Sequence, residues 1–329
     1  MADNPWGSSS SSPAPTPPRG REWELLESVV MASVQEQRRA RRWGIFFKLL
    51  TFLYIAAVVW MIFGVGKVDK AAISGSHTAV VNVSGEISDS SDASADAIIA
   101  GLQAAFEAPK SKAVVLRINS PGGSPVQSAY VYEEIRRLRA LHKDKKVYAV
   151  ITDMGASGAY YIAAAADQIY VNPGSLVGSI GVIMQGFGVQ GLMQKLGVED
   201  RTMTAGENKA ILSPFEPVKP QDKVHVKSVL DAVHQQFITA VRQGRGQRLK
   251  ESPEIFSGLF WTGQQAVELG LADGFGSVDS VARTVIGAED VVDYSEMPDP
   301  MTAMLRKLGA SMGEAVAARV APAQGMQLR

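Results

Sequence analysis

The sequence predicts an α/β domain, in which helices cover a mostly parallel sheet, behind a single transmembrane helix. From residue 79 onward, short runs rich in β-branched residues alternate with segments of helical periodicity, the pattern of parallel strands joined by helices. A long uncharged run stands near the N-terminus. Hydrophobic residues make up 46% of the 329 positions, which is enough for a large core and excludes a globally disordered chain.

The charge balance and the cysteine count exclude several kinds of function. The 33 Lys and Arg residues balance 33 Asp and Glu residues, so the chain lacks the overall basic field of a nucleic-acid-binding protein. The absence of cysteine excludes disulfides, thiolate metal sites and a cysteine nucleophile. A match to the dinucleotide fingerprint over 186–191 precedes barely one turn of helix, so no cofactor is expected. The histidines are too scattered for a metal cluster; they are His77, His142, His225 and His234.

Residues 1–42 are expected to form a disordered, cytoplasmic N-terminal segment. The first 20 residues contain five consecutive serines and five prolines, a composition that buries too little apolar surface to fold. Within the segment, residues 21–37 have the spacing of a short amphipathic helix, and four arginines follow at 38–42.

Residues 43–66 are predicted to be a transmembrane signal anchor. No residue from Leu49 to Val65 is charged. Extension back to Ile45 includes Lys48, whose long stem can reach the head groups, and gives a helix of about 31 Å, which matches the hydrocarbon core. A buried core helix and a cleaved signal peptide are the alternatives. The long segment before the apolar run argues against cleavage.

The charges that flank this span predict its orientation. The arginines at 38–42 precede it, whereas Lys67 and Lys70 follow it, so we expect the N-terminus in the cytoplasm and the rest of the chain across the membrane. Residues 67–78 are read as a small polar linker.

A single domain is predicted over 79–300, followed by a C-terminal tail over 301–329. The last long helical segment carries apolar residues on one stripe, which predicts that it packs along the core; these are Val226, Val229, Val233, Phe237 and Val241. The predicted strands are 79–83, 113–118, 147–151 and 168–171, and the predicted helices are 94–108, 128–142 and 221–245.

Ser157 is the strongest candidate for chemistry. It stands between a predicted strand and a helix rich in alanine, in the run Gly155-Ala156-Ser157-Gly158, so its hydroxyl is presented beside helix N–H groups that lack partners. An N-capping serine is the ordinary alternative. The run departs from the nucleophile elbow G-x-S-x-G because residue 159 is alanine.

A serine nucleophile needs a base, and the sequence offers histidine or lysine. His225 and His234 fall on the long predicted helix, and His142 falls on a charged helix end. Lys209 stands among small and apolar residues instead of in a charge run, although most lysines are solvated surface cations. The glycine-rich turn at 117–124 follows a strand and precedes a helix, so its N–H groups could point into a site.

Four stretches taken together resemble the signal peptide peptidase A family of membrane-anchored Ser/Lys proteases, peptidase family S49, in its short single-repeat form. They are residues 117–129, 154–182, 205–217 and 257–277, in this order. The resemblance implies a crotonase/ClpP-like fold of repeated ββα units. It also implies Ser157 as nucleophile, Lys209 as general base and Ser179 as the residue that orients the lysine. An oxyanion hole would combine the Gly158 N–H with one from the Gly122-Gly123-Ser124 turn.

The same resemblance implies a serine endopeptidase at the outer face of the bacterial cytoplasmic membrane. Its substrates would be released signal peptides and other short hydrophobic peptides. It would assemble into homo-oligomeric rings in which the serine and the lysine come from adjacent subunits. Three alternatives stay open: a related protease that acts on a specific membrane protein, a crotonase-like acyl-CoA enzyme, and a non-catalytic membrane scaffold.

Overall fold

The computed structural model describes residues 20–64 and 75–296. The chain divides into two compact units, residues 1–68 and 69–329. The predicted C-terminal tail, most of the linker and the first 19 residues of the segment 1–42, predicted to be disordered, lie outside the described residues. Residues 21–42 of that segment are helical.

Helix α1 (Arg21–Gly64) is continuous over 44 residues, about 66 Å at the usual rise. The predicted short helix over 21–37 is therefore the first part of a longer one that runs through the arginine cluster and the apolar run. The helix is long and apolar enough to cross a membrane. The Trp43 ring lies 5.7 Å from the rings of Phe46 and Phe47, and aromatic clusters of this kind anchor membrane helices at the interface.

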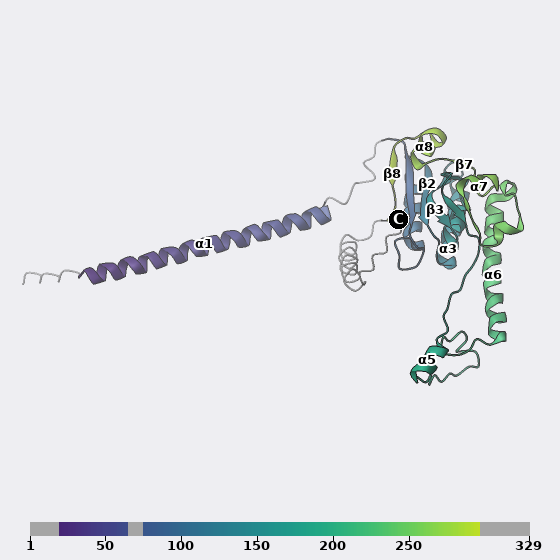
Figure 1. The fold of residues 1–329 in the computed structure, drawn as a ribbon. Helices are drawn as coiled ribbons and strands as arrows, with labels where there is room; N and C mark the ends of the chain where they lie inside the picture. Colours follow the sequence, from purple (N-terminus) through teal and green to yellow (C-terminus); the bar gives the residue numbers. More distant parts are fainter. Residues whose placement is uncertain (1–19, 65–74, 297–329) are drawn as a thin grey trace, which may run out of the picture. The chain divides into compact units, whose positions relative to one another are not determined.

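The second unit is built on a largely parallel sheet (Figure 1). The strand order is β6-β5-β3-β2-β1-β8, and β4 pairs with β3 and with β7. Of the described strand pairs, β5–β6 is antiparallel. The predicted α/β class and its four predicted strands are confirmed. The strands are β1 (His77–Ser84), β2 (Ser111–Ser120), β3 (Lys146–Ala156), β4 (Gln168–Val171), β5 (Leu176–Gly178), β6 (Phe260–Thr262), β7 (Gly274–Phe275) and β8 (Val291–Asp293).

The three helices predicted from the sequence are also present. They are α2 (Ala95–Glu107), α3 (Pro125–Leu141) and α6 (Pro220–Arg245). Helix α3 begins before residue 128 because Ser124 caps it and Pro125 occupies its first position, an arrangement that favours a helix start. The shorter helical elements are α4 (Gly158–Ala163), α5 (Gln190–Leu196), α7 (Gly263–Glu268), α8 (Val278–Val281) and turns at Gly246–Arg248, Pro253–Phe256 and Ala282–Ile286.

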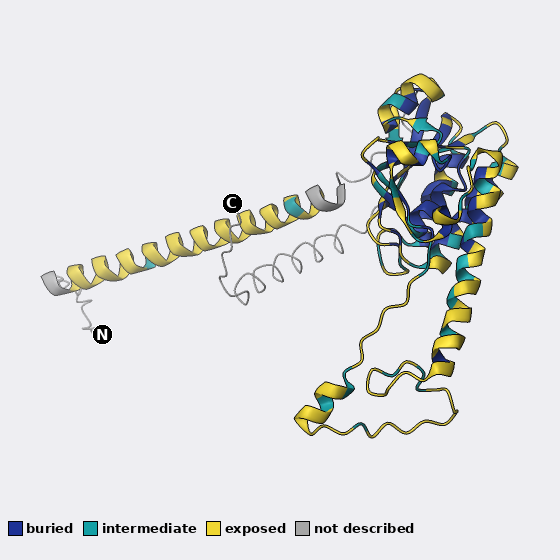
Figure 2. Cartoon of the chain, turned by 45° about the vertical axis from the view of Figure 1, so that its right-hand side comes forward, coloured by how far each residue is buried: buried dark blue, intermediate teal, exposed yellow. Residues whose placement is uncertain are grey.

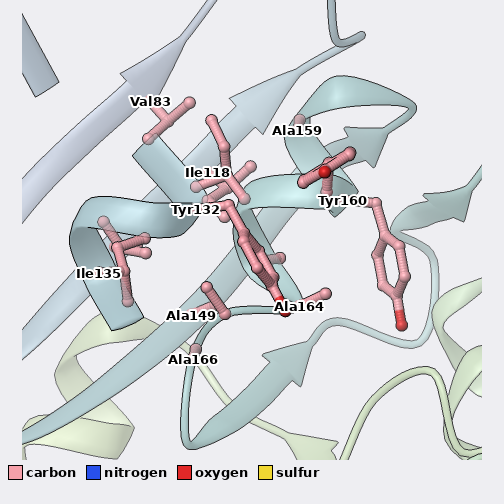
Figure 3. Close-up of a cluster of buried hydrophobic side chains, with 14 of the residues drawn as sticks. Val83, Ile118, Tyr132, Ile135, Ala149, Ala159, Tyr160, Ala164 and Ala166 are labelled. Carbon is pink, nitrogen blue, oxygen red and sulfur yellow. The ribbon is translucent and has the colours of Figure 1, made fainter. Parts of the chain in front are cut away.

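Both faces of the central strands are buried, which explains their continuous β-branched runs. On one face, Val81, Leu116 and Ala149 enter the main core with side chains of α2, α3 and α4. Figure 3 shows Ala149 in this core with Ile135 of α3 and Ala159 of α4. On the other face, their neighbours pack against α8 in a smaller cluster; these are Val80, Val115, Val150, Val278 and Val281. Strands β1, β2 and β3 pair in parallel, so their carboxyl ends share one edge of the sheet.

Only part of the apolar stripe on α6 packs on the core. Phe237 and Val241 are buried, whereas Val229 is 45% exposed. The prediction that the whole stripe packs on the core was therefore wrong at its N-terminal half. The reason is that the first turns of α6 extend beyond the sheet together with residues 183–219, which we call the arm and which include α5 (Figures 1 and 2).

The arm exposes many apolar side chains, and most of its ribbon has the colour of exposed residues in Figure 2. Phe187 is 86% exposed and Met203 is 96% exposed. Soluble single chains seldom leave a group of large apolar side chains in water. The others are Ile183, Met184, Leu192, Leu196, Val198, Leu212, Phe215 and Val218.

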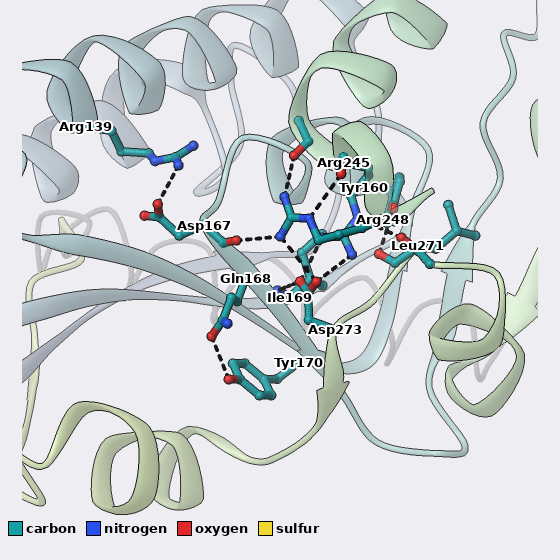
Figure 4. A network of polar contacts seen from close by, with 12 residues as sticks. Arg139, Tyr160, Asp167, Gln168, Ile169, Tyr170, Arg245, Arg248, Leu271 and Asp273 are labelled. Carbon is teal, nitrogen blue, oxygen red and sulfur yellow. Dashed lines mark hydrogen bonds and ion pairs between the residues drawn. The ribbon is translucent and has the colours of Figure 1, made fainter. Parts of the chain in front are cut away.

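A buried ion pair joins the end of α6 to the sheet (Figure 4). The Arg245 guanidinium donates to both oxygens of Asp273 at 2.8 and 2.9 Å and to Gly270 O at 2.9 Å. The Ile169 N–H also donates to Asp273. Arg248 adds a second cation beside the same carboxylate.

Replacing Arg245 by glutamine is expected to destabilise the domain by about 3–5 kcal/mol, because Asp273 would keep a buried charge without its partner. For a domain of this size the thermal midpoint falls by about 10 °C. The matched control is Arg242→Gln on the same helix, whose pair with Glu251 is about half exposed and should contribute far less to stability. Equal melting temperatures for the two variants would contradict this prediction.

The Asp273 carboxylate is also expected to make the stability of the domain depend on pH. Burial raises the pKa of Asp273, but the hydrogen bonds and charge of Arg245, with help from Ile169 and Arg248, outweigh it and hold the pKa below its ordinary value of 3.8. The stabilisation is therefore complete above that ordinary value and is lost as the pH falls further. Thermal melts of wild type and Asp273→Asn should converge below about pH 4; a constant difference down to strong acid would contradict this.

Candidate active site

Ser157 forms a strained junction between β3 and α4. Its φ of 52° and ψ of −126° lie in a region that non-glycine residues rarely adopt and that is concentrated at functional sites. The Ser157 N–H donates to Gly178 O at 2.8 Å, and its carbonyl accepts from the Tyr161 N–H at 3.0 Å. The hydroxyl makes no capping bond to α4. The ordinary reading of Ser157 as a helix cap therefore does not apply.

The glycine turn after β2 packs directly against Ser157. A Cβ on Gly122 would lie 2.7 Å from both Ser157 Cβ and Gly158 N, and a Cβ on Gly123 would lie 2.1 Å from Ile87 O. The two glycines have φ values of 97° and 150°. Both space and backbone conformation thus require glycine here.

The backbone N–H groups beside Ser157 differ in whether they have a hydrogen-bond acceptor. The Gly122 N–H donates to Ser120 Oγ at 3.1 Å, and the Ser124 N–H donates to Ile87 O at 2.8 Å. Within the described residues, the N–H groups of Gly123 and Gly158 have no acceptor. The Gly123 nitrogen lies 3.3 Å from where a Cβ of Gly158 would stand. Two such donors beside a nucleophile are what stabilises an oxyanion.

Ser157, Gly123 and Gly158 line an apolar cavity of about 340 Å³. The rings of Tyr161 and Phe237 stack on its wall, 4.8 Å apart, and burial raises the pKa of the Tyr161 phenol. The lining contains no His, Lys, Asp or Glu. The remaining side chains of the lining are Pro125, Val126, Ala129, Tyr130, Val182, Ile183, Val233 and Gln236.

Ser179 lies on the strand next to Ser157. Strands β3 and β5 pair in parallel, with Ala156 opposite Gly178, so each serine follows a paired residue. Ser179 has the same φ of 52°, and its N–H donates to Leu259 O at 2.8 Å. Its hydroxyl has no hydrogen-bond partner among the described residues.

Lys209 is not brought to this cavity by its own chain. It lies on the arm, where its N–H donates to Gly206 O at 3.1 Å in a turn, and it is exposed. It is absent from the residues that line the Ser157 cavity.

The four histidines also lie outside the cavity lining. The His234 ring is 3.0 Å from Ile180 O, His142 packs against Phe106, and His77 stacks on Tyr294. His225 is exposed on α6. Among the described residues, no group of His, Asp and Glu is arranged to hold a metal ion.

The apolar wall of the cavity was missed by the sequence analysis. Val126 and Tyr130 are 56% and 58% exposed, although both are large and lie on a helix that packs on the core. Their spacing of four places them on one face of α3, directly after the glycine turn. That combination is the signal that could have found them.

Comparison with known proteins gives two family matches. The sequence profile of peptidase family S49 matches residues 139–291. The profile of Clp protease matches residues 76–195.

Three relatives illustrate the range of similarity. A Brucella melitensis protein named Na(+)/H(+) antiporter NhaA is 47% identical over 186 residues, which cover 56% of this chain and 25% of that protein. A Synechocystis protein that carries the name of a protease is 34% identical over 207 residues, covering 62% of this chain and 74% of the relative. The chloroplastic serine protease SPPA of Arabidopsis thaliana is 30% identical over 227 residues, which cover 68% of this chain and 33% of that protein. The chain thus spans a quarter of the antiporter-named protein.

Proposed function

The chain belongs to peptidase family S49, and from this premise we propose that it is a membrane-anchored serine endopeptidase in which Ser157 is the nucleophile and Lys209 the general base. One observation carries the proposal. The Ser157 hydroxyl is uncommitted and stands beside two N–H groups without acceptors, in a cavity whose lining has no base of its own.

The missing base is supplied, in this proposal, by a second copy of the chain. The arm carries Lys209 and exposes large apolar side chains such as Phe187 and Met203. An interface between copies would cover them. Repetition of this contact, in which one copy's arm meets the next copy's cavity, closes a ring. A lone chain would then be inactive.

The chemistry follows from these groups. In the interface, the Lys209 amine takes the Ser157 proton while Oγ attacks the substrate carbonyl. The N–H groups of Gly123 and Gly158 hold the oxyanion. The protonated amine then donates its proton to the leaving nitrogen, and the peptide bond breaks. Water deprotonated by the amine hydrolyses the acyl-enzyme and restores Ser157. The Ser179 hydroxyl accepts a hydrogen bond from the lysine and orients it.

The cavity also supports a substrate class. Its walls are apolar, which suits small or apolar side chains next to the cleaved bond. Val182 and Ile183 follow β5 after a turn at Ser179 and line the cavity, and in this proposal an extended peptide pairs with their backbone. Released signal peptides and other short hydrophobic peptides fit these requirements. With the N-terminus in the cytoplasm, the domain would meet them at the outer face of a bacterial cytoplasmic membrane.

The cavity lining distinguishes the proposal from one of two alternative activities. An acyl-CoA enzyme would need cations for the cofactor phosphates, and the lining has none. A protease dedicated to one membrane protein would use the same groups on another substrate.

A serine-reactive phosphonate tests the proposal. Intact-mass analysis of the detergent-solubilised full chain is expected to show one adduct, at Ser157, on the oligomer. An oligomer that is folded and carries no adduct would overturn the proposed chemistry.

Replacing Gly122 by alanine is expected to lower kcat/KM by at least about 10²-fold, because the new methyl group would displace Ser157 and an oxyanion donor. The control is Gly85→Ala, which also has a positive φ of 80° but no atom within 4 Å of the added Cβ. Both variants share the backbone penalty, so their difference in activity reports the contact with Ser157. Equal activities would contradict the assigned geometry.

A further inference from the structure

The parallel strands give the domain two chemically different edges. The chain enters the domain at His77, the first residue of β1, where β2 and β3 also begin. The carboxyl ends of the same strands lead to the glycine turn and to Ser157. The edge by which the chain enters is thus the edge opposite the candidate active site.

Basic side chains gather at the entry edge. A surface hollow of about 390 Å³ is lined by six basic side chains and a single carboxylate, that of Asp167. Lys112 adjoins it, because the next residue, Ala113, pairs with Lys146. The six basic residues are Arg136, Arg139, His142, Lys143, Lys145 and Lys146.

Two of these basic side chains are bound to other groups of the fold. Lys145 Nζ donates to Phe106 O at 2.7 Å and to Ala108 O at 3.0 Å at the end of α2, and burial lowers its pKa. Arg139 pairs with Asp167 at 2.5 Å. These contacts account for the charge of the two residues within the fold.

Three lysines are not accounted for in this way. Lys112 and Lys143 are exposed and make no hydrogen bond or ion pair within the described chain. Lys146 is 58% exposed and makes only a long contact, 3.7 Å, to Asp167. We call Lys112, Lys143 and Lys146 the basic edge.

We propose that the basic edge rests on anionic lipid head groups. Residues 65–76, which connect α1 to β1, number 12 and span at most about 40 Å, so the entry edge stays close to any bilayer that holds α1. Tethering gives the lysines a high effective concentration of lipid. Each lysine near an anionic surface strengthens contact by about fivefold.

The opposite edge has the opposite charge. Glu86, Asp89 and Asp92 are exposed beyond the carboxyl end of β1, and Asp153 is exposed within the last residues of β3. An anionic surface therefore attracts one edge and repels the other, which turns the candidate active site toward water. This orientation does not depend on the assignment of Lys209 as the base.

The absence of cysteine from the chain makes a direct test simple, because one introduced thiol takes a fluorophore uniquely. Full-length Gln168→Cys carries the probe at the basic edge, and Ser90→Cys carries it at the opposite edge. Each is reconstituted in phosphatidylcholine vesicles with a head-group quencher, with and without phosphatidylglycerol. The probe at 168 is expected to be quenched only with phosphatidylglycerol, and high salt should relieve the quenching.

The charge variant is Lys112→Gln/Lys143→Gln/Lys146→Gln. It is expected to weaken docking by about a hundredfold, so that the probe at 168 behaves as in phosphatidylcholine alone. The matched control, Lys195→Gln/Lys223→Gln/Lys227→Gln, removes the same charge elsewhere and should leave the quenching unchanged. Melting temperatures of both variants report that they are folded.

The proposal is overturned if quenching at 168 is equal with and without phosphatidylglycerol, if it survives in the charge variant, or if it is no stronger than at 90. Lysine-dependent binding of polyglutamate without lipid quenching would assign the basic edge to an acidic polypeptide and would also overturn it.

Discussion

Ser157→Ala is expected to remove peptide hydrolysis, with a fall in kcat of about 10⁵–10⁶-fold. The reason is that the other hydroxyl beside Gly158 among the described residues, that of Ser128, donates to Ser124 O, whereas the Ser157 hydroxyl makes no such bond. Binding should persist, since the apolar wall of the cavity is intact. The measurement is cleavage of an internally quenched apolar peptide by the full chain in detergent. The phosphonate adduct should disappear in the same variant.

Ser90→Ala is the matched control for this experiment, because Ser90 is an exposed serine at the same edge of the sheet. It should keep both the activity and the adduct. Alanine at 157 retains the Cβ and hence the backbone strain of the parent, so the melting temperature should change little. If Ser157→Ala still cleaves the peptide at a rate near that of the parent, the assignment of the nucleophile is wrong.

Lys209→Ala is expected to reduce kcat by about 10²–10⁴-fold, the usual contribution of a general base. Mixing it with Ser157→Ala during assembly should restore activity if each site takes its serine and its lysine from different copies. At equal amounts, one half of the serines and one half of the lysines are intact, so about one quarter of the sites recover. Hydrolysis by the mixed oligomer is the measurement.

Lys195→Ala is the control for the lysine, since Lys195 is also exposed and lies on α5 of the same arm. It should retain full activity. A mixture of Ser157→Ala and Lys209→Ala that stays inactive, although both chains are present in one oligomer, would rule out a shared site. Full activity of Lys209→Ala would rule out Lys209 as the base.

Much of the fold could be predicted because its signals are local. The β-branched runs marked the central strands, and the residues between them have a helical period that survives in α2 and α3. The sharp turn at Ser157 was also readable, because small residues surround it. Its φ of 52° and the missing cap bond are tertiary facts that no residue pattern specifies.

The packing of the arm and of the first turns of α6 could not be predicted, for a different reason. The stripe on α6 has the same apolar period throughout, but Phe237 meets the core and Val229 does not. The hydrophobic period shows that one face of a helix is apolar, but it does not show what packs against that face. The place of Lys209 is equally undefined by a single chain. The cavity walls were missed because Tyr130 and Tyr161 come from different helices, which only folding brings together.

Strand β3 runs without interruption from Lys146 to Ala156, and Ser157 follows at its far end. At the usual rise this path measures about 35 Å. With Lys146 on the lipid surface, the length of β3 sets how far a substrate must extend from the bilayer to reach Ser157. A peptide that is still held in the bilayer by one end reaches Ser157 only after about ten extended residues have left the lipid. Shorter protrusions, including short external loops of intact membrane proteins, would stay out of range.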